Sequence, residues 1–317
     1  MSGVLINSIQ ASMSNPSDFS GQLLDSRFQV SDKIGEGGMA VVYRATDVET
    51  SEQVAVKIIH PELMADRTAM ARLRREAQYG RNFAHTNVCH IIRFGETDAG
   101  VGYLVMPYLE GEMLIERTFR DGPLSLELTA SIVSDVCAGL HVAHEQGVIH
   151  RDLKPENIML VKNGDGSERA VVLDFGLATA PELDAGRTKL TKAGMVVGTA
   201  DFMSPEQMRD KPVDHRSDIY SLAFMIYEVL TGQLPFKGET PRQLAVARMK
   251  GESIPLRTAR PDLAFPAAVD KVLLKALMVD PAQRYQTAPE FAAAFSRAAG
   301  VGASGRGLSG WIRRRFG

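Results

Sequence analysis

Between about residues 28 and 108, the chain alternates short apolar runs with turns. The runs are rich in Val, Ile and Tyr, and turns such as Asp98-Ala99-Gly100 separate them, which is the pattern of successive β-strands. A segment from about Arg67 to Asn82 interrupts the strands with the spacing of a helix. This part of the chain therefore predicts a small β-rich lobe that contains one helix.

The chain after Pro123 is mainly helical. Apolar residues recur there at spacings of three and four, which places them on one face of a helix. Proline-rich joints separate the helical segments that follow. The first buried stripe consists of Leu128, Ile132, Val136, Leu140 and Ala143. Further helices are predicted at about 218–231, 242–250, 267–278 and 288–298. We therefore predict an α+β fold, in which the β-rich lobe (about 28–108) precedes a larger helical lobe (about 109–296).

Two terminal segments lack this patterning. Residues 1–27 are rich in Ser, Asn, Gln and Gly, and residues 297–317 are rich in Gly and Ser, so we expect both to be tails outside the folded domain. The second tail ends in Arg313-Arg314-Arg315, close to Trp311 and Phe316. We interpret this cluster as part of a solvated tail. The alternative is a segment that contacts a membrane containing anionic lipid.

Composition narrows the classes of function. The chain has 317 residues, of which 44% are apolar, and this is enough to bury a large core. Its 36 basic residues are balanced by 38 acidic ones, so the net charge of −2 gives no general electrostatic case for binding nucleic acid. Cys89 and Cys137 have no spacing typical of metal or redox sites, and we find neither a run of about 18 apolar residues nor a secretory leader. We expect a cytoplasmic protein.

The densest group of chemically active side chains lies in His150-Arg151-Asp152-Leu153-Lys154-Pro155-Glu156-Asn157, followed by Asp174-Phe175-Gly176. Asp152 is a candidate proton acceptor, and Lys154 places a positive charge close to it in the sequence. Asn157 and Asp174 offer oxygen atoms, which are the ligands that Mg²⁺ prefers. Together these residues predict a site that transfers a phosphoryl group.

A glycine-rich turn lies near the start of the predicted strands. The backbone amides of Gly35-Glu36-Gly37-Gly38 could close over phosphates; the alternative is an ordinary hairpin that needs positive φ. Lys57 follows in an apolar run, where a charge is costly without a partner. Glu76 on the predicted helix can supply that partner. The alternative is a solvated lysine and a glutamate on the helix surface.

These motifs resemble the protein kinase domain of the serine/threonine class, and most of all its bacterial members. The resemblance covers about residues 28–296 and implies a two-lobed kinase fold that uses ATP with Mg²⁺, or with Mn²⁺ in its place. It also implies that Ser and Thr hydroxyls of protein substrates are phosphorylated. By this resemblance, Lys57 holds the α- and β-phosphates, Glu76 braces Lys57, Asn157 and Asp174 bind the metal, Asp152 orients the substrate hydroxyl and accepts its proton, and Lys154 adds a fixed positive charge.

The resemblance also places the adenine site. Tyr103–Leu109 is an apolar strand that ends in a segment similar to the family's hinge, with Met106 as the gatekeeper. Pro107 stands where an acidic residue is common, and it lacks an amide hydrogen. We expect no loss from this, because the family uses the carbonyl at this position and the amide of Leu109. The residues expected to sandwich the adenine ring, all of them equally compatible with a place in the core, are Val42, Ala55 and Met159.

Gly198–Glu206 resembles the segment that closes the activation loop of the family. By the same resemblance, Glu206 forms a buried ion pair with Arg284. Asp218 is expected to hold the backbone of the segment 150–157, the catalytic loop of the family, and a helix N-cap is its alternative role. Two histidines match positions that are structural in the family, namely His144 and His150.

Two departures from the family pattern are small. Ala40 and Ala223 each replace a glycine, at a cost of roughly 1 kcal/mol where positive φ is required. The main rival interpretation is a pseudokinase scaffold that binds partners without catalysis; it is disfavoured because the lysine, the catalytic aspartate and both metal ligands are present. A small-molecule phosphotransferase is disfavoured by the segment at 198–206, which resembles a platform for a polypeptide.

Phosphorylation of the chain itself is a further expectation. Thr191, or less strongly Thr188, could carry a phosphate that pairs with Arg151 and orders the loop around it. The alternative is that both are exposed loop residues. Thr199 is interpreted as a contact to the catalytic Asp152 and its neighbouring lysine. Autophosphorylation would bring two copies of the chain together as a homodimer.

Overall fold

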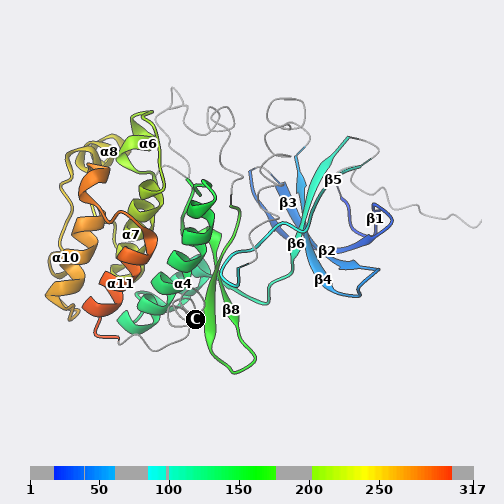
Figure 1. The fold of residues 1–317 in the computed structure, drawn as a ribbon, viewed down its shortest axis with the longest axis horizontal. Coiled ribbons are helices and arrows are strands. Elements are labelled where there is room, and N and C mark those ends of the chain that lie inside the picture. Colours follow the sequence, from blue (N-terminus) through cyan, green and yellow to red (C-terminus); the bar gives the residue numbers. More distant parts are fainter. Residues whose placement is uncertain (1–17, 39, 61–84, 98–99, 176–201, 302–317) are drawn as a thin grey trace, which may run out of the picture.

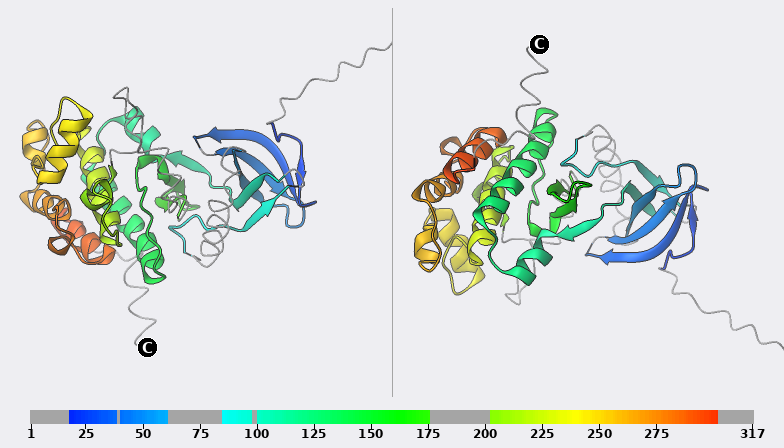
Figure 2. Two further views of the ribbon diagram at one scale, coloured as in Figure 1. Left: turned by 90° about the horizontal axis from the view of Figure 1, so that it is seen from above. Right: turned by 90° about the horizontal axis from the view of Figure 1, so that it is seen from below.

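The chain folds into two lobes that differ in secondary structure (Figures 1 and 2). The structure is a computed structural model and describes residues 18–38, 40–60, 85–97, 100–175 and 202–301. Strands make up most of the N-terminal lobe, and helices make up most of the C-terminal lobe. The predicted α+β fold class is therefore confirmed. The helix predicted at about 67–82 lies outside the described residues.

Six antiparallel strands form the sheet of the N-terminal lobe, in the order β1-β2-β3-β4-β6-β5. β-Branched residues and tyrosine are frequent along them, and β4 in the middle of the sheet is buried on both faces. The strands are β1 (Leu23–Leu24), β2 (Phe28–Glu36), β3 (Ala40–Asp47), β4 (Gln53–Ile59), β5 (Arg93–Glu96) and β6 (Gly102–Pro107).

The sheet curls until its two edges meet. Asp25, directly after β1, forms an ion pair of 2.6 Å with Arg93 at the start of β5, although these strands are at opposite edges (Figure 1). The curl encloses a small core, and residues from five strands fill it. That core consists of Leu24, Phe28, Val30, Tyr43, Ala45, Val54, Val56, Ile58, Tyr103 and Val105.

The expectation that residues 1–27 form a tail is wrong for residues 18–27. Leu24 in β1 is only 5% exposed, and the ring of Phe19 packs edge-on against Tyr43 with 6.4 Å between ring centroids. A strand of two residues is too short to show an alternating pattern. The sequence therefore gave no signal for it. At the other end, Val301 packs against the core of the helical lobe, so the folded part also extends past residue 296.

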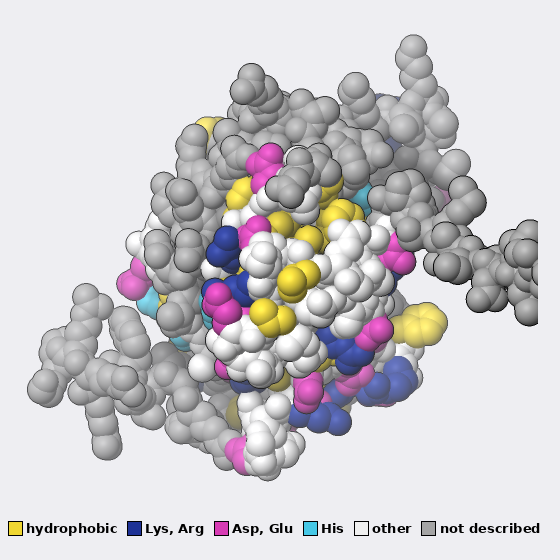
Figure 3. Space-filling view, turned by 90° about the vertical axis from the view of Figure 1, so that its right-hand side faces the viewer, with side chains coloured by type: hydrophobic (Ala, Val, Ile, Leu, Met, Phe, Trp, Pro, Cys, Tyr) yellow, Lys and Arg dark blue, Asp and Glu magenta, His cyan; other side chains and the backbone are white. Residues whose placement is uncertain are grey.

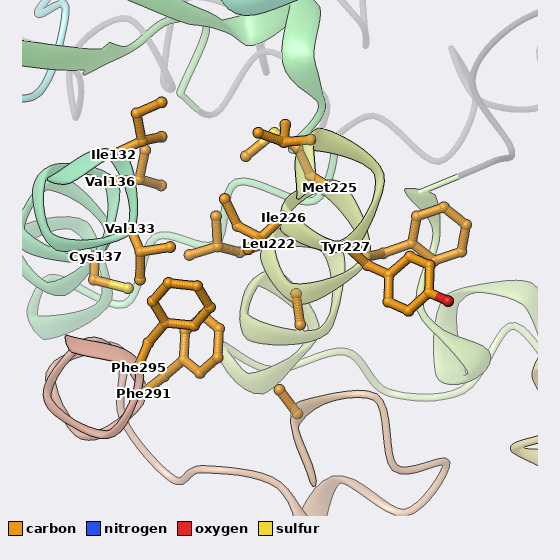
Figure 4. Packing of buried hydrophobic residues seen from close by; sticks show 14 of the residues in the cluster. Ile132, Val133, Val136, Cys137, Leu222, Met225, Ile226, Tyr227, Phe291 and Phe295 are labelled. Carbon is orange, nitrogen blue, oxygen red and sulfur yellow. The ribbon is translucent and has the colours of Figure 1, made fainter. Parts of the chain in front are cut away.

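Three helices build the core of the C-terminal lobe (Figure 4). They are α4 (Leu126–Glu145), α7 (Arg216–Thr231) and α11 (Ala288–Ala298). Ser125 caps α4, because its Oγ accepts a hydrogen bond of 3.2 Å from the Leu128 amide. By length and hydropathy α4 could cross a membrane, but half of it is buried within this core. Side chains that meet between the three helices include Ile132, Val136, Cys137, Leu222, Ile226, Phe291 and Phe295.

The other helices surround this core, and the predicted ones begin and end within two residues of the observed ones. They are α3 (Leu114–Asp121), α6 (Pro205–Met208), α8 (Pro241–Lys250), α9 (Leu256–Ala259) and α10 (Ala267–Ala276), with 3₁₀ turns η1 (Pro155–Asn157) and η3 (Pro281–Gln283). The helices α3, α6 and α9 and a second, three-stranded sheet were not predicted from the sequence.

A three-stranded sheet, in the order β7-β8-β9, belongs to the C-terminal lobe and carries the site. Its strands are β7 (Gly111–Met113), β8 (Ile158–Lys162) and β9 (Glu168–Val172). A Cβ atom on Gly111 would lie 2.1 Å from the Leu160 carbonyl oxygen, so glycine is needed for β7 to approach β8. The segment 150–157 leads directly into β8, and Asp174 follows β9. The β8–β9 hairpin therefore brings both motifs to the same end of this sheet.

The two alanine departures do not carry the expected strain. Ala40 and Ala223 are not among the described residues with positive φ, and both are buried. Ala40 packs with Ile59, Ile91 and Leu104. The penalty of roughly 1 kcal/mol therefore does not apply at either position.

Charged side chains of both signs are scattered over the outside of the N-terminal lobe. Figure 3 shows this end of the molecule, where basic and acidic side chains lie interspersed over the described surface. Several of them form ion pairs between neighbouring strands, such as Arg44 with Asp32 and Arg27 with Asp47. Neither sign of charge dominates this face.

Candidate active site

A buried aspartate of α7 holds the backbone of the catalytic loop, as expected. The Asp218 side chain is fully buried and accepts hydrogen bonds of 2.9 Å from the amides of His150 and Arg151. His144 Nε2 lies 2.7 Å from the same carboxylate. Burial raises the pKa of Asp218, but the hydrogen bonds from His144 and from the His150 amide lower it by more. The pKa of Asp218 is therefore below its usual value. Asp218 is therefore a fixed negative charge behind the loop.

The alternative role of Asp218 as an N-cap is wrong. The N-cap of α7 is His215, and Asp218 is the third residue of the helix. Arg151, which Asp218 holds, has φ of +66°, a conformation that non-glycine residues rarely adopt. The two hydrogen bonds to Asp218 therefore support a turn that costs energy.

Asp152, Lys154 and Asn157 form one hydrogen-bonded cluster in this loop. Lys154 Nζ lies 3.0 Å from Asp152 Oδ2, and both side chains are less than one-fifth exposed. Asn157 Nδ2 donates to the Asp152 carbonyl at 2.7 Å. The cluster therefore fixes a carboxylate beside a cation, with a small part of the carboxylate still open to solvent.

His150 has a structural place, as expected. Its Nε2 lies 2.9 Å from the Leu173 carbonyl oxygen, and its Nδ1 accepts a hydrogen bond of 3.3 Å from the Asp152 amide. These partners correspond to a neutral ring that carries its proton on Nε2. The ring also packs edge-on against Phe175 at 4.9 Å. It ties the catalytic loop to the segment that carries Asp174.

Lys57 and Asp174 meet from the two lobes. Lys57 Nζ lies 2.7 Å from Asp174 Oδ1, and the lysine side chain is 16% exposed. The alternative of a solvated lysine is therefore wrong. Burial raises the pKa of Asp174, but the charge and the hydrogen bond of Lys57 lower it by more. The pKa of Asp174 is therefore below its usual value, and this carboxyl stays ionised. Glu76, the predicted partner of Lys57, lies outside the described residues.

Most of the residues expected around adenine lie on one face of the N-terminal sheet, and Met159 lies in β8. Val42 is directly opposite Lys57, and Ala55 is directly opposite Met106, so these four side chains point to the same side. The sheet continues to Pro107, which pairs with a residue of β4. Met106, Leu109 and Met159 also share an apolar cluster with residues from β8 and β9. The members that the sequence analysis did not identify are Cys89, Val161, Val171 and Leu173.

The described residues of the glycine-rich turn, 35–38, form an open hairpin without positive φ. Gly35 pairs with Val42, and the amide of Gly37 donates to the Ala40 carbonyl at 2.9 Å. A Cβ atom added at Gly37 or Gly38 would meet nothing within 4 Å. The alternative explanation, a hairpin that needs positive φ, is wrong because none of these glycines has it. Glu36 is paired with Lys33 on the outer side.

The segment after residue 201 is anchored by the predicted ion pair. Glu206 and Arg284 join through two hydrogen bonds of 2.7 Å, and the arginine side chain is fully buried. Burial raises the pKa of Glu206, but its hydrogen bonds with Arg284 and Ser217 lower it by more. The pKa of Glu206 is therefore below its usual value. One link to the catalytic loop was not predicted: Gln207 Nε2 donates to the Arg151 carbonyl at 2.8 Å.

Part of the predicted site lies outside the described residues. This applies to Gly176, to residues 198–201 including Thr199, and to the proposed phosphorylation sites Thr188 and Thr191. A surface cavity of about 700 Å³ lies elsewhere, next to α8. It shares no lining residue with the catalytic cluster, since residues 237–252 line it.

Comparisons with known proteins agree with this geometry. The family model described as "Protein kinase domain" matches residues 28–294. A probable serine/threonine-protein kinase of Corynebacterium efficiens is 41% identical over 272 residues, which is 84% of this chain and 40% of the relative. The serine/threonine-protein kinase pkn3 of Myxococcus xanthus is 36% identical over 87% of this chain and 50% of the relative. The chain thus spans half or less of these relatives.

Solved structures show the same fold. The PknI kinase domain of Mycobacterium tuberculosis matches with a TM-score of 0.68 and 26% identity, over 87% of this chain and 97% of that one. Rad53 in complex with AMP-PNP matches with a TM-score of 0.67 and 25% identity, over 84% of this chain and 64% of that one. With the site geometry and the family match, these findings show that the chain belongs to the protein kinase domain family, in its bacterial serine/threonine type.

Proposed function

We propose that the protein is a serine/threonine protein kinase, which transfers the γ-phosphoryl group of ATP to Ser and Thr hydroxyls of proteins. The observation that carries this proposal is a pair of contacts between charged side chains. Lys57 lies 2.7 Å from Asp174, and Lys154 lies 3.0 Å from Asp152. Each of the two carboxylates thus lies beside a cation, which supports a site for phosphoryl transfer.

Asp152 acts in this proposal as the acceptor of the hydroxyl proton. Its carboxylate is held in place by Lys154 and by the backbone bonds that Asp218 makes to the loop. Phosphoryl transfer passes through a loose transition state with negative charge on the phosphoryl oxygens, so catalysis depends on positioning and on cations. Lys154 and Lys57 supply two such charges from this chain.

ATP binding is supported by the apolar face of the N-terminal sheet. Val42, Ala55, Met106 and Met159 would enclose the adenine ring, with the Pro107 carbonyl and the Leu109 amide as its hydrogen-bonding partners. Lys57 would then contact the α- and β-phosphates, and the backbone from Gly35 to Gly38 would cover them. Ile34, directly before the loop, is 46% exposed although it is apolar. A bound base would cover some of this surface.

The residues present fit a divalent metal. Asn157 uses its amide nitrogen for the Asp152 carbonyl, which leaves its amide oxygen for a ligand, and Asp174 stays ionised beside Lys57. Such hard oxygen atoms suit Mg²⁺, and Mn²⁺ is an alternative. When bound, the metal would supply positive charge to the phosphate oxygens.

Regulation of the same site is part of the proposal. A phosphate on Thr191 or Thr188 would pair with Arg151, whose backbone already links the catalytic loop to Asp218 and Gln207. Mass spectrometry after incubation with ATP tests this against Asp152→Asn. A fully active enzyme with an unmodified loop would contradict it. Formation of the phosphate in trans would require a homodimer, at least transiently.

A cytoplasmic location is also proposed, from the composition and the two reduced cysteines. The arginine cluster near the end of the chain is assigned to a solvated tail. Sedimentation with anionic liposomes, compared between the wild type and a variant with Arg313, Arg314 and Arg315 replaced by serine, distinguishes this from membrane contact.

Incubation with labelled ATP and Mg²⁺ tests the proposed activity. The chain is assayed alone and with a generic basic protein, beside Lys57→Met and Asp152→Asn. We expect labelling by the wild type and not by either variant. A pseudokinase would label neither itself nor the added protein, although it could still bind nucleotide.

A further inference from the structure

The segment Phe202–Met208 is attached to the helical lobe at several points. Ser221 Oγ of α7 donates to the Phe202 carbonyl at 2.7 Å, and the Phe202 ring packs edge-on against Phe224 at 5.4 Å. Ser204 caps the short helix α6 by accepting a hydrogen bond from the Gln207 amide. The carbonyl group of Phe202 is thus held by a side chain of the helical lobe.

Arg248 is the charged residue that holds Met203. It lies on α8 and is only 2% exposed, and its Nη2 donates to the Met203 carbonyl. Its guanidinium carbon lies 4.9 Å from the centroid of the Phe224 ring. Phe224 therefore contacts both Phe202 and Arg248, so the arginine and the segment are packed through a shared aromatic ring.

Arg248 is a charged residue at a buried position of α8. Ala247 and Arg248 are the buried residues of α8, whose remaining residues are half-buried or exposed. Burying a guanidinium costs energy that an apolar residue of similar size would avoid. What the arginine adds is a directed hydrogen bond from a charged donor, which fixes the position of one carbonyl.

The position of this carbonyl matters because the segment connects to the catalytic loop. Gln207, four residues after Met203, donates to the Arg151 carbonyl at 2.8 Å, and Arg151 precedes Asp152. Met203 itself is half-buried, so part of it remains accessible to a polypeptide. A shift of the segment would therefore change where a polypeptide lies relative to Asp152.

The geometry points to Arg248 as a positioning residue for the polypeptide substrate: from α8 it holds the Met203 carbonyl and thereby sets the distance between the bound polypeptide and Asp152. This inference rests on the proposed kinase function. It concerns the protein substrate, because Arg248 contacts the Met203 carbonyl and the Phe224 ring and lies beside Tyr220, and none of these three residues is assigned to ATP.

The test measures KM for ATP and for a generic basic protein separately, with Arg248→Met, Arg248→Lys and Ser221→Ala. The methionine keeps most of the apolar stem and removes the donors, while the lysine keeps the charge. Lys250→Met is the matched control, since it removes one positive charge from the same helix at a side chain that is 62% exposed. Nucleotide binding by each variant is measured by calorimetry to confirm folding.

We expect Arg248→Met to raise KM for the protein about tenfold, in keeping with the loss of a hydrogen bond from a charged donor, and to leave KM for ATP within about twofold. Arg248→Lys should recover most of the loss, and Lys250→Met should match the wild type. Ser221→Ala should raise the same KM, since it releases the neighbouring carbonyl.

Equal KM values for the protein in Arg248→Met and Lys250→Met would overturn the inference. An equal rise in both KM values for Arg248→Met would also overturn it. If Arg248→Met does not bind nucleotide, Arg248→Lys and Ser221→Ala decide, and wild-type KM values in both would again overturn it. Absence of phosphorylation by the wild-type chain would instead contradict the proposed function.

Discussion

Replacing Arg284 with methionine is expected to destabilise the fold by about 3–5 kcal/mol at pH 7, because one charge of a buried pair then lacks its partner. The wild-type guanidinium makes two hydrogen bonds of 2.7 Å to Glu206 and a third of 2.7 Å to the Met278 carbonyl. It also lies over the Tyr220 ring at 4.9 Å. Methionine can fill much of this space but can replace none of the donors.

The size of this effect should depend on pH. In the wild type the pKa of Glu206 is lowered in the folded state, so the pair adds stability above the unfolded pKa of about 4.3 and loses it as pH falls through the lower, folded pKa. In Arg284→Met, burial without the arginine should raise the pKa of Glu206, so the variant becomes less stable as pH rises toward 7. The difference between the two proteins should therefore be largest near pH 7 and shrink toward pH 4.

Urea denaturation followed by circular dichroism at several pH values measures this difference. The matched variants are Glu206→Gln and the double variant with Arg284→Met, which complete a double-mutant cycle. The double variant should be more stable than Arg284→Met alone, because no unpaired carboxylate remains buried. A cost below about 1 kcal/mol at pH 7, or a cost that stays constant between pH 4.5 and 7, would refute the reasoning.

Three further predictions concern the fold and the loop. Leu24→Ala should cost about 2–4 kcal/mol in urea denaturation, whereas Leu23→Ala, at a side chain that is 49% exposed, should cost less than about 0.5 kcal/mol; equal costs would contradict the burial of β1. Asp218→Asn removes a carboxylate oxygen from one loop amide, so it should lower the free energy of unfolding by about 1–3 kcal/mol and lower kcat at least tenfold. An unchanged kcat would contradict the role of Asp218 in holding the loop. Gly111→Ala should lower the melting temperature, because the new Cβ would lie 2.1 Å from a carbonyl oxygen of β8, while Gly164→Ala has open space around it; equal melting temperatures would contradict the close approach.

The pattern of apolar residues predicted the long elements well. The spacing from Leu128 to Ala143 gave α4, and the apolar helix around Leu222 gave α7 to within two residues. Long periodic segments repeat their signal several times, so a single polar residue does not hide it. The strands β7, β8 and β9 have only three to five residues each, which is too short for such a signal.

Part of the candidate site could be predicted from the sequence, and part could not. Motif resemblance gave the roles of Asp152, Lys57 and Asp174, which stay predictions. The structure places Lys57 against Asp174, and Asp152 against Lys154. Resemblance could not give contacts that depend on how separate elements pack. The bonds of Gln207 to the Arg151 carbonyl and of Arg248 to the Met203 carbonyl join residues 56 and 45 positions apart, and a glutamine and an arginine have no local pattern that marks them.

In the proposed function, Asp152 accepts the proton of a protein hydroxyl during phosphoryl transfer. The most direct measurement is the single-turnover rate of transfer to a generic basic protein by Asp152→Asn and by the wild type, with ATP affinity determined on the same samples. The account predicts a rate lower by a factor of about 10² or more, as for the loss of a general base, with ATP affinity within about twofold. Equal single-turnover rates in the two proteins would contradict it.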